Sequence, residues 1–182
     1  MNLIIEDAAF ALDESKVEQI EQVLDVLDRT FGPLTRTRVM IAGGFINSLF
    51  GGELNDVDVF PDPSFKEQLF EKLVPYQEKT GNYGVKAKIE DINFDFVGMD
   101  KGSDPIEVLE SFDMVHCCVG YYCGKLIYHP DWYNCIANKA IEMMQPDPKT
   151  WYRILKYLQR GYTISQEELA KVVSLISLKQ TL

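Results

Sequence analysis

The sequence has no apolar run long enough to cross a membrane, and its first residues contain no secretory signal pattern. A membrane-spanning helix needs about 20 consecutive apolar residues, and no stretch of the 182 residues reaches that length. The opening segment, MNLIIEDAAFALDESK, has no basic residues ahead of its apolar ones and has acidic residues early. We therefore expect a cytoplasmic protein that has no membrane partner.

Positive charge is also scarce. The chain has 18 lysines and arginines against 28 aspartates and glutamates, which gives a net charge of −10. Proteins that bind nucleic acid through a general electrostatic attraction are usually basic. Any contact with nucleic acid must therefore come from a local positive patch, or from metal ions that bridge the phosphates.

Cysteine is limited to four residues, and none of them forms a C-x-x-C pair. The four are Cys117, Cys118, Cys123 and Cys135. A zinc site that includes the adjacent His116 is an alternative, but the spacing matches no common ligand pattern. On a strand, neighbouring side chains would also point to opposite faces. Because cytosolic thiols stay reduced, we interpret these cysteines as small buried hydrophobic residues.

The hydrophobic pattern predicts an α+β fold. Apolar residues at helical spacing indicate helices over 13–30 and 64–76, and short buried runs indicate strands at 37–43 and 56–60. Two further strands, 84–90 and 92–99, are predicted to join tightly around Asp91, and residues 114–130 are predicted to form a hairpin that turns at Gly124-Lys125. Helices are expected over roughly 130–143, 148–160 and 165–178. We therefore expect a mixed sheet flanked by helices over 1–130, and a C-terminal helical segment over 131–182 packed on that core.

Residues 41–60, IAGGFINSLFGGELNDVDVF, place two carboxylates one residue apart in a predicted buried strand. Positions i and i+2 of a strand share a face, so Asp56 and Asp58 should point the same way, with Cα atoms roughly 6–7 Å apart. Val57 and Val59 should then pack on the other side. Two carboxylates this close repel each other unless a cation lies between them. Mg²⁺ is the natural candidate because it prefers carboxylates together with phosphate oxygens of a substrate.

Two further features complete this predicted site. Gly43 and Gly44 follow a strand and open a helix, where backbone N–H groups can approach a phosphate closely. Asp95 lies in the apolar strand INFDFVG. If that strand pairs beside Asp56 and Asp58, Asp95 faces the same cations. Sites that contain two metals about 3.5–4 Å apart commonly use such carboxylates.

Three segments in this order resemble the nucleotidyltransferase superfamily typified by DNA polymerase beta. They are GGFINSLFGGELNDVDVF, SFDMVHCCVGYYCGKLIYHPDWYNCIANKAI and WYRILKYLQRGYTI, and the similarity spans roughly residues 38–162. They are most similar to the head domain of class II CCA-adding enzymes and bacterial poly(A) polymerases. The patterns of that family are GGxVRDxLLG with a later DxDL, RDFTINAL, and EDxxRxLRAxRF.

The resemblance implies a nucleotidyltransferase fold and a Mg²⁺-dependent transfer of a nucleoside monophosphate from an NTP to an acceptor hydroxyl, such as an RNA 3′ end or a tRNA. It implies that Asp56 and Asp58 hold two Mg²⁺ ions, and that Asp95 contributes to the metal site and to activation of the acceptor. The residues at its nucleotide-binding positions are Gly43, Gly44, Asn47, Ser48, Asp113, Arg153 and Lys156.

The chain departs from the family pattern at several positions. Asn47-Ser48 replace an Arg-Asp pair, Phe112 replaces an arginine, and Lys149-Thr150 replace a pair of acids. We therefore expect a minimal stand-alone transferase, of a size that suits a phage-encoded or accessory protein, rather than a full CCA-adding enzyme. The alternatives are a catalytically silent nucleotide-binding or interaction module that has kept the fold, and a tRNA-end transferase that is assisted by a partner chain.

The third segment also contains a stripe of basic residues at helical spacing, namely Lys149, Arg153, Lys156 and Arg160. On a helix these side chains share a face, where a triphosphate or a nucleic-acid backbone could bind. The alternative is an ordinary solvated helix face. The apolar residues expected to pack the helix on the sheet are Trp151, Leu155 and Leu158.

Overall fold

A computed structural model describes residues 2–54, 56–80, 84–98, 104–147 and 150–179. These residues form a mixed eight-stranded sheet in the order β1-β8-β7-β2-β3-β6-β5-β4, and a two-stranded sheet of β9 and β10. The strands are β1 (Ile4–Asp7), β2 (Val39–Ala42), β3 (Val57–Pro61), β4 (Gln77–Thr80), β5 (Gly84–Ile89), β6 (Ile92–Val97), β7 (Val119–Tyr122), β8 (Lys125–Tyr128), β9 (Ala140–Ile141) and β10 (Thr163–Ile164). The helices are α1 (Ala8–Ala11), α2 (Glu14–Phe31), α3 (Gly44–Ser48), α4 (Pro63–Leu73), α5 (Pro105–Glu110), α6 (Trp132–Ala137), α7 (Thr150–Gln159) and α8 (Gln166–Lys179). The predicted α+β class, with a mixed sheet flanked by helices, is confirmed.

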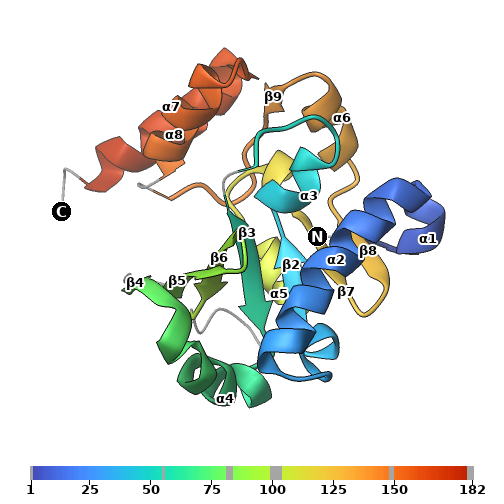
Figure 1. The fold of residues 1–182 in the computed structure, drawn as a ribbon. Coiled ribbons are helices and arrows are strands. Elements are labelled where there is room, and N and C mark those ends of the chain that lie inside the picture. The colour runs from blue at the N-terminus through green and yellow to red at the C-terminus, as the bar shows by residue number, and fades with distance from the viewer. Residues whose placement is uncertain (1, 55, 81–83, 99–103, 148–149, 180–182) are drawn as a thin grey trace.

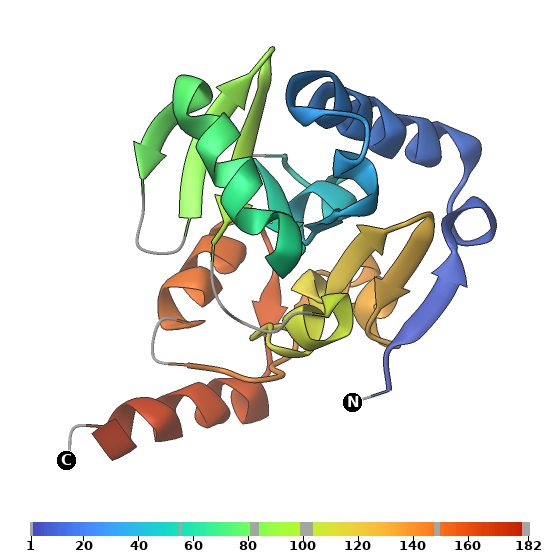
Figure 2. The same cartoon turned by 90° about the horizontal axis from the view of Figure 1, so that it is seen from below.

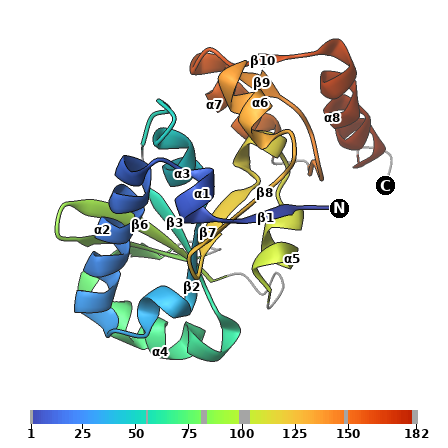
Figure 3. The ribbon, with the colours of Figure 1, turned by 90° about the vertical axis from the view of Figure 1, so that its right-hand side faces the viewer.

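The sheet is covered differently on its two faces. Helices α2 and α4 lie on one face and α5 lies on the other (Figures 1 and 3). Val57 and Val59 of β3 point into the main core, which is shared with α2 and α4. Met40 of β2 points the opposite way and packs with Leu109 of α5. Because α5 has only six residues, it leaves part of its face of the sheet open.

Capping residues define the ends of α2 and α4, the two helices that cover the main core. Asp13 caps α2 by accepting a hydrogen bond from the Lys16 N–H at 3.0 Å, and Gly32, at φ 113°, ends the helix. Asp62 caps α4 in the same way by accepting from the Ser64 N–H at 2.7 Å. The helices predicted over 13–30 and 64–76 are therefore confirmed with small changes of boundary.

Both predicted hairpins are present. Strands β5 and β6 pair so that Ile89 lies opposite Ile92, and the turn at Glu90-Asp91 is accommodated by Glu90 at φ 53°. Strands β7 and β8 pair so that Tyr122 lies opposite Lys125. The edge strands β1 and β4 were not predicted. All four residues of β4 are exposed, so this strand lacks the alternation of apolar and polar residues that reveals a half-buried strand.

The sequence predicted that the first strand of the hairpin over 114–130 includes the first two cysteines. In the structure this strand, β7, begins only at Val119. Val115–Cys117 form the short 3-10 helix η3. The His116 side chain is fully buried there, and its ring packs edge-on to Tyr157 with the centroids 4.2 Å apart. Cys117, Cys118 and Cys135 are buried, as predicted, but Cys123 is exposed in the β7–β8 turn.

The helix predicted over 130–143 is wrong in its second half. Helix α6 ends at Ala137, Lys139 adopts φ 48°, and the chain then forms β9, which pairs in parallel with β10. Helix α8 lies across the molecule from α2 (Figure 2), and α7 and α8 lie side by side at the end far from α4 (Figure 1). They belong to a second hydrophobic cluster, which consists of Met114, Cys117, Ile141, Met143, Ile154 and Val172.

Helix α7 is also rotated relative to the prediction. Ile154 is its buried apolar residue, whereas Leu155 and Leu158 are 41% and 39% exposed. The expectation that Leu155 and Leu158 pack on the sheet is therefore wrong, because α7 packs against the second cluster instead. Lys149, the first member of the predicted basic stripe, lies outside the described residues.

Candidate functional site

The three predicted catalytic carboxylates lie together on the face of the sheet that α5 covers only in part. Asp58 of β3 and Asp95 of β6 are register partners on adjacent parallel strands. Asp56 lies immediately before β3 and lines the same cleft as Asp58 and Asp95. The predicted pairing of the Asp95 strand beside Asp56 and Asp58 is thus present in the structure.

A lysine that the sequence analysis did not select lies among these carboxylates. Lys86 of β5 is the register partner of Asp95. Its ammonium nitrogen is 2.5 Å from Asp56 Oδ2 and 3.1 Å from Asp95 Oδ2. The hydrogen bond to Asp56 is the main reason why the pKa of Lys86 is raised above its usual value. Lys86 is therefore held in its charged form between two acids.

Asp58 is the most electrostatically strained of the three acids. Its side chain is largely buried, and this burial, followed by the negative charges of Asp56 and Asp95, raises its pKa from 3.8 to about 7. A carboxyl group with these neighbours is stabilised in its ionised form only when a cation approaches it. Such perturbed groups in a cleft are typical of functional sites.

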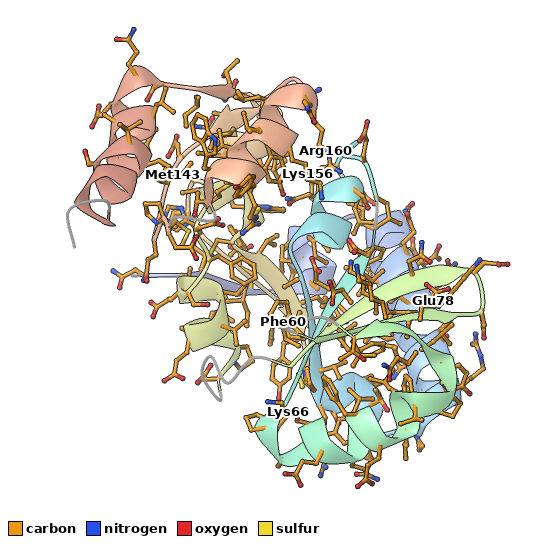
Figure 4. All side chains as sticks on the ribbon, turned by 90° about the vertical axis from the view of Figure 1, so that its left-hand side faces the viewer. Phe60, Lys66, Glu78, Met143, Lys156 and Arg160 are labelled. Carbon is orange, nitrogen blue, oxygen red and sulfur yellow. The ribbon has the colours of Figure 1, made fainter. Side chains whose placement is uncertain are left out.

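The carboxylates form one wall of a large cleft with a volume of about 1080 Å³. The opposite wall comes from α7 and the residue that follows it, and it contributes Arg153, Lys156 and Arg160. Lys156 and Arg160 lie along α7 on the side toward the loop that precedes β3 (Figure 4). That loop contacts α7 through Glu53, whose Oε2 is 3.5 Å from Arg160 Nε. The cleft therefore combines three carboxylates with three cationic side chains, of which Arg153 and Arg160 already have acidic partners.

The cleft also contains an ion pair in which only the acid is buried. Asp113, only 8% exposed, forms an ion pair with Arg153 and accepts a hydrogen bond from Thr150 Oγ1 at 3.0 Å. The Arg153 guanidinium also lies 3.3 Å from the Cys117 sulfur. Burial raises the pKa of the Cys117 thiol above its usual value. Asp113 and Arg153 thus line the cleft as an ion pair.

Gly43 and Gly44 differ in how freely a phosphate could approach their backbone. Gly43 has φ 66°, and its N–H donates to the Val119 carbonyl at 2.9 Å. A Cβ on Gly43 would lie 3.6 Å from Asp58 Oδ2, whereas a Cβ on Gly44 would meet nothing within 4 Å. The Gly43 N–H is thus already used within the protein, and Gly44 is the member of the pair that leaves an open approach to the backbone.

Asn47 and Ser48 are not among the residues that line the cleft. The buried Asn47 amide donates to the His116 carbonyl at 2.6 Å and accepts from Trp132 Nε1 at 2.9 Å. Ser48 Oγ donates to the Phe45 carbonyl at 2.7 Å. The structure therefore separates these two predicted nucleotide-binding residues from the other five, which all line the cleft.

The chemistry of the three carboxylates suits Mg²⁺. Three carboxylates on one face are the oxygen ligands that Mg²⁺ prefers, and Asp56, Asp58 and Asp95 supply them. As arranged, however, no group of three or more acidic, histidine or cysteine side chains in the described part of the chain is placed to hold a metal ion. The residues therefore fit Mg²⁺ in their chemistry, while the Lys86 ammonium contacts Asp56 and Asp95 in the present arrangement.

Solved structures of tRNA-processing nucleotidyltransferases share this fold. A CCA-adding enzyme in complex with CTP has a TM-score of 0.67 at 17% identity, covering 97% of this chain and 46% of that one. The Thermotoga maritima CCA-adding enzyme in complex with tRNA has a TM-score of 0.63 at 19% identity, covering 91% and 44%. A tRNA nucleotidyltransferase with a primer tRNA and an ATP analog has a TM-score of 0.55 at 19% identity, covering 78% and 47%.

These likenesses show that the chain has the nucleotidyltransferase fold, and that it spans less than half the length of the structures it matches. A sequence model of the Gabija anti-defense 2 (Gad2) family matches residues 14–139, more than half of the chain. The protein belongs to this Gad2 family. None of the curated proteins compared matches it. Among the helices in the described ranges, none combines the length and the apolar character that a membrane span requires.

Proposed function

We propose that the protein is a Mg²⁺-dependent nucleotidyltransferase that moves a nucleoside monophosphate from an NTP to an acceptor hydroxyl. The observation that supports this most strongly is the pairing of Asp58 with Asp95, with Asp56 on the same face. These acids lie across the cleft from the cationic side chains of α7. A cleft that combines clustered carboxylates with cationic side chains such as Lys156 suits a polyphosphate bridged by metal ions.

In this proposal, each wall of the cleft has a separate role. Asp56, Asp58 and Asp95 would hold the cations, and Asp95 would also orient the acceptor hydroxyl. Lys156 would attract the triphosphate, which could approach the backbone closely at Gly44 because no side chain blocks it there. Bound Mg²⁺ would supply charge neutralisation at the transferring phosphate. Positioning and electrostatics account for most of the catalysis in such transfers.

The comparisons suggest which partners to test first. The similar structures contain CTP, an ATP analog or tRNA, so we propose an NTP as donor and an RNA 3′ end or tRNA as one class of acceptor. The description of the family is anti-defense against Gabija. We therefore also propose that transfer serves that role, in the cytoplasm and from a phage-encoded or accessory protein, with a protein acceptor as the second class.

A catalytically silent nucleotide-binding module is the second candidate. Lys86 favours it, because an ammonium group already neutralises Asp56 and Asp95. Phe112 favours it as well, since it lines the cleft where the resemblance places an arginine. In that case the cleft would bind an NTP and no group would be transferred.

One assay separates these candidates. The protein is incubated with Mg²⁺, each labelled NTP, and either total RNA or total protein, beside the double variant Asp56→Asn/Asp58→Asn. Asp91→Asn is the matched control, because that carboxylate is fully exposed in the β5–β6 turn. We expect label transfer by the parent and the control, and none by the double variant. NTP binding without transfer in any variant would support the silent module.

A further inference from the structure

We propose that Lys86 is a built-in competitor for the divalent cation: its ammonium group holds Asp56 and Asp95 when the metal is absent, and it must leave before the metal binds. This inference rests on the proposed function, because it concerns the same carboxylates. It adds a residue that lowers the affinity of the site for the metal ion.

The backbone register places Lys86 where it can do this. Strands β3, β6 and β5 are neighbours in the sheet, and the register puts Asp58, Asp95 and Lys86 side by side across them. Side chains at register positions share a face. A residue at position 86 is therefore directed toward the carboxylates by the hairpin itself.

The contacts show that a single ammonium group serves two acids. Lys86 Nζ lies 2.5 Å from Asp56 Oδ2 and 3.1 Å from Asp95 Oδ2. Mg²⁺ would require oxygens of the same two carboxylates. The ammonium and the metal therefore cannot both keep these contacts, and the two cations exclude each other at the site.

The exposure of Lys86 and its two acidic partners indicates that a metal ion can displace the ammonium group. Its side chain is 49% exposed, and those of Asp56 and Asp95 are 29% and 28% exposed. Ion pairs of such exposure contribute little each, and lysine carries its charge on a flexible stem. The pairing is thus strong enough to reduce metal affinity and too weak to prevent metal binding.

Lys88 provides a matched control on the same strand and face. Its side chain is also 49% exposed, and its Nζ lies 3.9 Å from Oδ1 of the turn residue Asp91, a long ion pair. Lys86→Met and Lys88→Met change the net charge equally. Any general effect of charge on cation binding therefore appears in both variants, whereas competition for the carboxylates appears in one.

The test is a titration of the nucleotide-free protein with Mn²⁺, followed by electron paramagnetic resonance of the free ion. We expect Lys86→Met, and Lys86→Gln as a second variant, to bind Mn²⁺ about 3- to 30-fold more tightly than the parent. Lys88→Met should stay within about twofold of the parent, since exposed charges are weakly coupled to the site. Thermal unfolding of each variant verifies that it is folded.

Two results would overturn the inference, and they separate it from the proposed function. If the parent binds Mn²⁺ and Asp58→Asn abolishes binding, but both Lys86 variants match Lys88→Met, the metal site stands and the competition is refuted. If neither the parent nor any Lys86 variant binds Mn²⁺, both the metal site and the competition are refuted.

Discussion

Asp58 and Asp95 are register partners on the adjacent parallel strands β3 and β6, and their carboxyl groups share one face of the sheet. Residues 58 and 95 are far apart in sequence, so only the pairing of the two strands brings them together. Asp58 is also the acid whose pKa rises to about 7. The fold thus holds like charges close together, which is unfavourable unless a cation such as the Lys86 ammonium or a metal ion lies among them.

Replacing Asp58 should stabilise the metal-free protein while abolishing transfer. Asp58→Asn removes a largely buried charge that is repelled by Asp56 and Asp95. We expect the free energy of unfolding at pH 8 to rise by about 1–2 kcal/mol, since one unit of pKa shift corresponds to about 1.4 kcal/mol. Urea unfolding in EDTA measures this change. A loss of stability would show that the Asp58 carboxylate has a structural role instead.

Gly44→Ala should weaken nucleotide binding without lowering the stability of the protein. Gly44→Ala adds a methyl group that meets no other atom of the protein within 4 Å. We expect it to leave thermal stability unchanged or slightly raised, and to weaken NTP binding at least about tenfold, because the methyl group would block the approach of a phosphate. Calorimetric titration with an NTP measures the affinity. Unchanged affinity would place the triphosphate elsewhere in the cleft.

Asn47 should stabilise the fold and contribute little to nucleotide binding. Asn47→Ala removes the buried hydrogen bonds to the His116 carbonyl and from the Trp132 indole. We expect it to lower the free energy of unfolding by about 2–4 kcal/mol, because buried groups are left without partners. NTP affinity, measured well below the unfolding temperature, should change less than about twofold. A large loss of affinity at full stability would restore the role that the sequence predicted for this residue.

His116 should make the protein sensitive to acid. Burial lowers its pKa from 6.5 to about 3, with Arg153 as a further cause. Between these two values the unfolded chain binds a proton that the folded protein does not. Stability is therefore full above about pH 6.5 and falls as the pH drops, by up to about 1.4 kcal/mol per unit.

Urea unfolding of the parent and of His116→Phe, between pH 5 and 7, tests this dependence. The phenylalanine variant keeps an aromatic ring beside Tyr157 and cannot be protonated. Its slope over this range should be smaller than that of the parent. Equal slopes would assign the pH dependence to other groups.

The Asp113–Arg153 pair should be energetically coupled. Arg153→Met leaves the buried Asp113 carboxylate with Thr150 as its hydrogen-bond partner. We expect a loss of about 1–3 kcal/mol, less than for a fully buried pair because Arg153 is partly exposed. Adding Asp113→Asn should recover part of this loss in a double-mutant cycle. Arg160→Met, whose partner Glu53 is exposed, should cost less than about 1 kcal/mol.

The carboxylate strands were predictable because their signal is local. Val57 and Val59 alternate with Asp56 and Asp58, and Phe94 and Phe96 flank Asp95. Alternating buried residues set the face of every side chain on a strand. The position of Lys86 was also contained in the sequence, since a tight turn at Glu90-Asp91 places it opposite Asp95, but its contact with Asp56 required the order of three strands.

The rest of the site depends on tertiary packing that no local pattern encodes. Strands β9 and β10 have two residues each, too few for any periodicity. Leu155 has the spacing of a buried residue and is exposed, because α7 packs through Ile154 into the second cluster instead of on the sheet. Asn47 follows the glycine pair in sequence, where the resemblance predicts nucleotide binding. Its side chain instead forms hydrogen bonds with His116 and Trp132.

The most direct test is a crystal structure of the protein with Mn²⁺ and a non-hydrolysable NTP, collected at a wavelength where manganese scatters anomalously. The account predicts an anomalous peak in contact with Asp56, Asp58 and Asp95, with the Lys86 ammonium displaced and the triphosphate between this peak and α7. A nucleotide bound without manganese at these three acids, or manganese bound only elsewhere, would contradict it.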